Sequence, residues 1–205
     1  MGPLDKLELA KNKLRILGYN CRFWNDYVVL GILNVKNTNG IDPNRVYKLY
    51  DYNHGKLLKL PTNCYGVVLN SFFVVTYGYT DDIRKFVQVY TFKDGIPSKT
   101  LTNTDGFELV SEFKGDGLDS KLLILRKNSI DSNSNEYYIL NGSGDYILIT
   151  LAKSILDLWC ANDRVYIKHS EDGLVYITGT AFSCRAKKYG KRSKPYIIGE
   201  DLSIK

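Results

Sequence analysis

The residues best suited to chemistry form one cationic run in the last quarter of the chain. The run reads Arg185-Ala186-Lys187-Lys188-Tyr189-Gly190-Lys191-Arg192-Ser193-Lys194, with six cationic side chains and no anionic one. The net charge of the whole chain is +6, so the other residues together are close to neutral. Lysine and arginine bind phosphates with release of counterions, and a tyrosine ring stacks on a base. The pattern predicts either a polyanion-binding site or a solvated surface loop, and its binding residues would be Arg185, Lys187, Lys188, Tyr189, Lys191, Arg192 and Lys194.

A second group of candidate residues is acidic and lies in predicted loops. Asp81 and Asp82 are adjacent, and Asp116 lies between two glycines, three residues before Asp119. If two of these carboxylates converge, they would act as the acid and base of a hydrolase for a sugar or phosphorylated substrate. The sequence has no serine-nucleophile, phosphate-loop or zinc-protease motif. We therefore predict no catalytic residue, no metal and no cofactor, with the hydrolase as the alternative.

The cysteines and histidines favour structural roles. The four cysteines lie far apart, without the close pairs of zinc or redox sites: Cys21, Cys64, Cys160 and Cys184. We expect all four to be unpaired and mostly buried. His54 and His169 fall in predicted turns, which indicates a polar role in the turn.

The elements that must position these residues begin with a helix. From Leu4 to Leu17, apolar residues recur every three or four positions, and Gly18 follows as a stop signal. We expect Leu7, Leu14 and Leu17 to be buried against the rest of the protein, because an isolated helix of this length is marginal in water. Residues 1–18 are therefore predicted to be an N-terminal amphipathic helix and residues 19–205 a β domain.

From Cys21 onward, short β-branched and aromatic runs alternate with turn residues about every ten positions, which is typical of an antiparallel meander. Tight hairpin turns are predicted at Gly55, Gly95 and Gly173, and another at 141–144. The last of these four hairpins would join 164–168 to 174–177, and residues 196–198 would add the outer strand. The fold class predicted is all-β.

The strands also recur at a longer interval. In four strand–turn–strand segments, the equivalent positions are Tyr27, Phe72, Leu122 and Val165, at intervals of 45, 50 and 43 residues. Such intervals are expected of propeller blades, in which stacked sheet units cover one another's faces. We predict about four stacked antiparallel four-stranded meanders, propeller-like in arrangement, with a two-sheet sandwich as the runner-up. Trp24 and Trp159, in the first and last units, would be neighbours if the ring closed.

One segment carries a resemblance to a known family. Residues 162–168 (Asn-Asp-Arg-Val-Tyr-Ile-Lys) and 170–176 (Ser-Glu-Asp-Gly-Leu-Val-Tyr) resemble blades of the pyrroloquinoline-quinone and kelch types of β-propeller. The cofactor ligands of quinoprotein dehydrogenases and the Gly-Gly doublet of kelch repeats are absent. The resemblance therefore implies an architecture and no activity.

These observations together predict a non-catalytic interaction module, whose rigid β scaffold presents loops to a partner. A protein is the leading partner, with nucleic acid as the alternative through residues 185–194. No apolar stretch is long enough to span a membrane and no secretory signal pattern begins the chain, so we expect a soluble, cytoplasmic protein. A single Gln beside 16 Asn and many Lys suggests an AT-rich genome, such as that of a virus of a thermophilic archaeon.

Overall fold

The computed structural model describes residues 1–35, 45–62, 64–79, 85–101, 106–109, 119–127, 134–152, 157–168, 175–179, 187–189 and 194–205. Helix α1 spans Pro3–Ile16, and the strands that follow form antiparallel sheets. Sheet A has the order β1 (Asn20–Trp24), β2 (Val28–Asn34), β3 (Arg45–Asp51) and β4 (Lys56–Leu58). Sheet B has the order β5 (Cys64–Leu69), β6 (Val74–Tyr79), β7 (Lys85–Thr91) and β8 (Ser98–Lys99), with the 3-10 turn Lys93–Gly95 before β8. Both sheets are meanders in chain order, as predicted.

The strands of sheets C and D do not follow one another in simple chain order. The core of sheet C is the meander β9 (Phe107–Leu109), β10 (Leu122–Lys127), β11 (Ser134–Asn141) and β12 (Tyr146–Ala152). β15 (Val175–Gly179) and β16 (Lys187–Tyr189) extend it beyond β12. Sheet D contains β13 (Asp157–Ala161), β14 (Arg164–Lys168) and β17 (Tyr196–Ile198). Residues 203–205 run back beside β17, with Ile197 and Lys205 exchanging backbone hydrogen bonds of 3.1 and 3.0 Å, and so they occupy the fourth-strand position.

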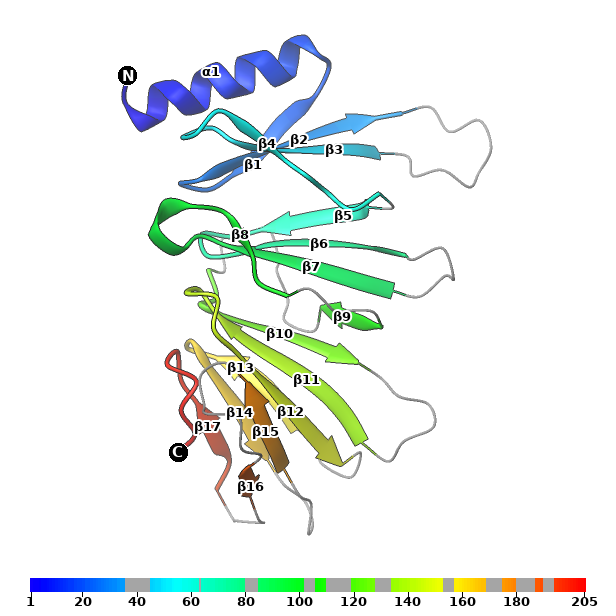
Figure 1. Ribbon diagram of the computed structural model, residues 1–205, viewed down its shortest axis with the longest axis vertical. Helices are drawn as coiled ribbons and strands as arrows, with labels where there is room; N and C mark the ends of the chain where they lie inside the picture. The colour runs from blue at the N-terminus through cyan, green and yellow to red at the C-terminus, as the bar shows by residue number, and fades with distance from the viewer. Residues whose placement is uncertain are drawn as a thin grey trace.

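The four sheets stack face to face in chain order and do not close into a ring (Figure 1). Alternation along each strand places successive side chains on opposite faces, so each inner sheet contributes to two cores. β10 shows this most clearly, because Leu123 and Leu125 face sheet B while Leu122 and Ile124 face sheet D, and all four are buried. The cores between A and B, between B and C, and between C and D are centred on Leu30 and Phe92, on Phe73 and Leu140, and on Ile149 and Ile167.

Helix α1 covers the outer face of sheet A. Leu7 and Leu14 are each 5% exposed and pack with Ala10 against Tyr19, Val29 and Tyr52. The prediction for Leu17 was wrong: it is 60% exposed, because the helix ends at Ile16 and Leu17 is its C-cap. Gly18 then turns the chain with φ +92°, a conformation that glycine adopts without strain.

Two of the predicted glycine turns are confirmed and one hairpin is wrong. Gly55 and Gly95 have φ of +69° and +73° in the turns before β4 and β8. Gly173 lies outside the described residues. The hairpin predicted around it does not form, because β14 pairs with β13 and β17, whereas β15 pairs with β12 and β16 of the neighbouring sheet. The outer strand predicted at 196–198 is confirmed as β17.

Side-chain amides join successive sheets at one end of the stack. Asn25 accepts hydrogen bonds from the backbone N–H of Tyr27 and Val28, and its Nδ2 donates to the carbonyl of Asn70 at 3.0 Å. Asn70 repeats the arrangement in sheet B, where its Nδ2 donates to the carbonyl of Ser120 at 3.1 Å. Each amide therefore shapes the turn in its own sheet and contacts the same turn in the next, 45 and 50 residues along the chain.

The two tryptophans lie in different surroundings. Trp24 lies under the Nζ of Lys11 from α1, 3.4 Å from the ring centroid, whereas Trp159 stacks on Tyr166 in sheet D. The neighbour relation expected of a closed ring is therefore not present.

Cys21, Cys64 and Cys160 are unpaired as predicted, and burial raises the pKa of all three thiols. Cys184 lies outside the described residues.

Candidate functional site

The outer face of sheet D is the surface that distinguishes the two ends of the stack. Helix α1 covers the outer face of sheet A, but within the described part of the chain no layer packs on the outer face of sheet D. We call this surface the end face. Its residues are those that alternate with the core residues of the sheet: Asp157, Trp159, Ala161, Arg164, Tyr166, Lys168, Ile197, Ser203 and Lys205, with Asp157 in register with Lys168.

An aromatic and aliphatic row crosses the middle of the end face. Trp159 pairs with Tyr166 across β13 and β14, and Tyr166 pairs with Ile197 across β14 and β17. The two rings are stacked, with centroids 5.3 Å apart and planes 8° apart. Trp159 is 39% exposed, and neither its indole N–H nor the Tyr166 hydroxyl has a hydrogen-bond partner among the described residues. Trp and Tyr combine an apolar ring with a polar group that seeks a hydrogen-bond partner, so these groups are available to solvent or to a ligand.

Exposed cations lie on both sides of the row. Arg164 and Lys168 flank Tyr166 on the same face of β14, and both are exposed. Neither makes an ion pair within the described part of the chain. Lys168 also lies at the end of the sheet where β17 begins, because Ile167 pairs with Tyr196. Lys194, which is exposed, lies two residues before β17 begins at this end of the sheet.

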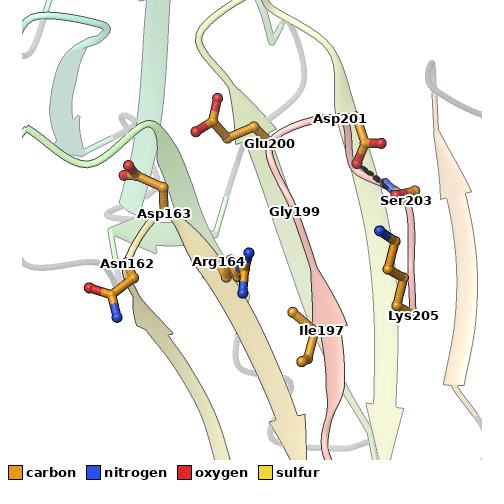
Figure 2. Close-up of a pocket in the computed structure, with 9 residues that line it drawn as sticks. All are labelled: Asn162, Asp163, Arg164, Ile197, Gly199, Glu200, Asp201, Ser203 and Lys205. Atoms are coloured by element: carbon orange, nitrogen blue, oxygen red, sulfur yellow. Dashed lines mark hydrogen bonds between the residues drawn. The ribbon is translucent and has the colours of Figure 1, made fainter.

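A hollow of about 520 Å³ opens beside the row, at the end of the strands that lies away from Lys168. Figure 2 shows Arg164, Ile197 and Lys205 around it, with Gly199 contributing bare backbone between them. The tight turn after Gly199 forms its rim, where Leu202, at φ +62°, is fully buried and anchors the loop. A volume of this size is within the range of ordinary ligand pockets.

The acidic groups on the rim are already hydrogen-bonded. Asp163 accepts from the backbone N–H of Lys121 at 3.1 Å, and Glu200 lies 3.5 Å from the Nζ of Lys121. Asp201 accepts from the hydroxyl and N–H of Ser203, which hold the pKa of that carboxyl below its usual value. These acids therefore stabilise the turns that hold sheets C and D together.

A second hollow, of about 470 Å³, lies between sheets B and C and is lined by tyrosines. Tyr65 and Tyr79 meet edge to face with centroids 5.4 Å apart, and the ring of Tyr77 lies over the bare backbone of Gly66. Glu108 at its wall pairs with Arg126 at 2.7 Å and Lys85 at 3.3 Å, and these partners hold its pKa below the usual value. The acid is therefore neutralised, and the hollow is mainly aromatic.

The structure places the predicted polyanion-binding residues in different settings. Lys187, Lys188 and Tyr189 form β16, the edge strand of sheet C, so this part of the run is a strand and not the loop that was expected. Lys194 borders the end face. Arg185, Lys191 and Arg192 lie outside the described residues.

The predicted acidic residues are not brought together by anything described. Asp81, Asp82 and Asp116 lie outside the described residues. Asp119 accepts hydrogen bonds from the N–H and hydroxyl of Ser71 at 3.1 and 2.8 Å, which links sheets B and C. His54 has the turn role predicted for it, since its Nδ1 lies 2.7 Å from Asp51 within the turn. His169 lies outside the described residues.

Sequence reasoning missed the end face. The alternation of Arg164, Tyr166 and Lys168 with Val165 and Ile167 was visible, and it identifies one polar and one apolar side of β14. It did not show which side would lack a neighbour, because that depends on the order in which the sheets stack.

Within the described residues, no helix has the length and apolar character that a bilayer crossing requires. Nor, in that part of the chain, do three or more His, Cys, Asp or Glu side chains have an arrangement suited to a metal ion. Comparison of the chain with models of protein families, with curated proteins and with solved structures found no match. The resemblance to propeller blades therefore stays a prediction.

Proposed function

We propose that this chain is a non-catalytic interaction module that binds a macromolecular partner on the end face. The single observation that supports this is the row Trp159–Tyr166–Ile197, in which Trp159 is exposed and the other two are half-buried, on a sheet whose opposite face packs into the core. Trp, Tyr and Arg are the side chains that most often dominate binding energy, and Arg164 adjoins the row.

The stacked architecture suits this role. Sheets A, B and C pack on both faces, and sheet D packs on sheet C through one apolar core. The amide contacts of Asn25 and Asn70 join the turns of sheets A, B and C, and Asp163 joins the turn of sheet D to sheet C. Side chains on such a sheet are held in place before a partner arrives, which lowers the entropic cost of binding. The free end of the stack is then a rigid platform.

A photochemical cross-linker placed on the end face tests the proposal. Benzoylphenylalanine in place of Ala161, which is exposed beside the row, should give a discrete adduct in an extract of the source cells. The matched control carries the same group in place of Leu57, which is 57% exposed on sheet A. Unlabelled wild-type protein should compete for the adduct, and the double variant Trp159→Ala, Tyr166→Ala should not. Equal adducts at both positions, or equal competition by both proteins, would show that the end face is not the binding surface.

A further inference from the structure

The end face combines exposed rings with cations in a way that selects one class of partner. Trp159 is 39% exposed on the edge strand β13 and stacks on Tyr166, which is half-buried between Trp159 and Ile197. The polar groups of both rings are unpaired within the described part of the chain. Arg164 and Lys168 stand on the same strand as Tyr166, one on each side of it. Aromatic rings on an open sheet, bordered by Arg and Lys, are how proteins bind unpaired bases and their phosphates.

The course of the chain limits how far part of the cationic run can lie from the end face. β14 ends at Lys168 and β17 begins at Tyr196, so the connection between these two paired strands contains all of residues 185–194. Tyr189 at the end of β16 is seven residues from Tyr196, which limits their separation to about 25 Å. Of the run that carries the net charge of the molecule, Lys187–Tyr189 therefore lie on the edge of the neighbouring sheet C, and Lys194 borders the end face.

The acidic groups at the rim of the hollow lie away from Lys168 and Lys194 and do not cancel their positive charge. They gather at the turn end of the hollow, where Asp163 and Glu200 are engaged by Lys121. Lys168 and Lys194 lie at the other end of the strands. The face thus carries Lys168, in register with Asp157, at one end of the strands, and Arg164 with the hydrogen-bonded acids of the hollow at the other.

We propose that the end face binds single-stranded nucleic acid, with bases on Trp159 and Tyr166 and phosphates on Arg164 and Lys168. This inference rests on the proposed function, since it assigns a partner to the same surface. Sheet D with its returning C-terminal strand is about 14 Å wide, four strands at the usual spacing, and aromatic-bearing sheets of four strands hold two or three bases. Paired bases in a duplex are already stacked and would not be bound this way.

Fluorescence anisotropy of labelled dT15 and rU15 tests the proposal. The double variant Trp159→Ala, Tyr166→Ala should weaken binding of both oligonucleotides roughly tenfold or more, because each base–ring stack contributes strongly. The variant Arg164→Ala, Lys168→Ala should weaken binding and flatten the slope of log affinity against log salt by about 1.4, which is 0.7 for each phosphate contact. The control Lys56→Ala, Lys93→Ala removes two exposed cations from sheets A and B and should change neither quantity. Thermal unfolding of each variant checks that the fold is intact.

Intrinsic fluorescence provides a second readout at the ring itself. In the variant Trp24→Phe, Trp159 is the only tryptophan, and saturating dT15 should quench its emission. Binding without quenching would overturn the proposal, as would wild-type protein that fails to bind at 50 mM salt.

The variants also separate this inference from its neighbours. If Lys187→Ala, Lys188→Ala, Lys191→Ala, Arg192→Ala abolishes binding while the ring variant binds normally, the cationic run alone is the site and the end face is not. If no oligonucleotide binds but the cross-link at position 161 is still competed by wild-type protein, the proposed function stands and only the nucleic-acid partner is wrong.

Discussion

At the scale of single residues, Asn70 is the side chain that ties two sheets together. Its Oδ1 accepts from the N–H groups of Phe72 and Phe73, and its Nδ2 donates to Ser120 in the next sheet. Asn70→Ala should lower the free energy of unfolding by about 2 kcal/mol, because net hydrogen-bond contributions of about 1 kcal/mol are lost in both sheets.

A graded variant separates the two contributions. Asn70→Asp keeps the acceptor and loses the donor, so it should cost roughly half as much. Urea denaturation measures each value, and Asn34→Ala, on an exposed strand end, is the control. An Asp variant as unstable as the Ala variant would mean that the contact to Ser120 accounts for the whole effect.

Tyr52 makes stability depend on alkaline pH. Burial, reinforced by Asp26 and Asp51, raises the pKa of its phenol to about 12, and the hydroxyl donates to the carbonyl of Asn25 at 2.6 Å. Because the folded-state pKa lies above the unfolded value of about 10, this stabilisation is present below pH 10 and is lost as the pH rises through 12.

The variant Tyr52→Phe should therefore be less stable than wild type by about 1 kcal/mol at pH 7. The gap should narrow between pH 10 and pH 12, since phenylalanine cannot ionise. Unfolding free energies measured at pH 7 and pH 11 check this, with the exposed Tyr65→Phe as control. A gap that stays constant with pH would contradict the assignment.

At the scale of elements, helix α1 depends on one face for its stability. Leu14 is buried against sheet A, while Ile16, two positions later, is 84% exposed. Leu14→Ala should destabilise the protein by about 2–4 kcal/mol, and Ile16→Ala by less than about 0.5 kcal/mol. Chemical denaturation followed by circular dichroism compares the two, and equal losses would show that the helix does not pack as described.

Strand periodicity predicted the elements well, because the signals concerned are local. The apolar and aromatic runs of β2 and β3, the glycines at 55 and 95, and the Asn-led turns at 25 and 70 are each signals within a few residues. The segment Leu4–Leu17 predicted as helix ends one residue beyond α1, since Leu17 continues the apolar spacing although its backbone has left the helix.

Strand partnership was less predictable than strand position. Residues 164–168 and 174–177 flank an Asp-Gly turn signal, yet β14 and β15 join different sheets. β12 had an edge available to β15, and β14 had one available to β17, and the choice between these pairings depends on strands more than twenty residues away. The end face was unpredictable for the same reason, since exposure of Tyr166 is a property of the stack and not of β14.

At the scale of the whole molecule, the described residues of each layer pack on the layers next to it. The core residues of each interface come from adjacent sheets in chain order. Stability should then be nearly a sum of neighbouring interfaces, as in repeat proteins. Leu49→Ala, in the core between sheets A and B, should speed amide exchange in α1 and in those two sheets while leaving sheets C and D protected.

Hydrogen-exchange mass spectrometry measures this directly. Ile147→Ala, buried between sheets C and D, is the matched variant and should show the opposite distribution. Uniform acceleration across all four sheets in either variant would mean that the molecule unfolds as one cooperative unit.

The excursion of the chain between β14 and β17 has a mechanical consequence. The polypeptide leaves sheet D, adds β15 and β16 to sheet C, and returns to sheet D as β17. The backbone therefore connects these two sheets more than once. A pulling force applied at the end face would act on β14 and β17 first. The chain segments that connect these strands to β15 and β16 would transmit the force to sheet C, the widest sheet in the described part of the chain. Sheet D is thereby anchored against tension, whereas sheets A and B are joined to their neighbours by a single crossing of the backbone each.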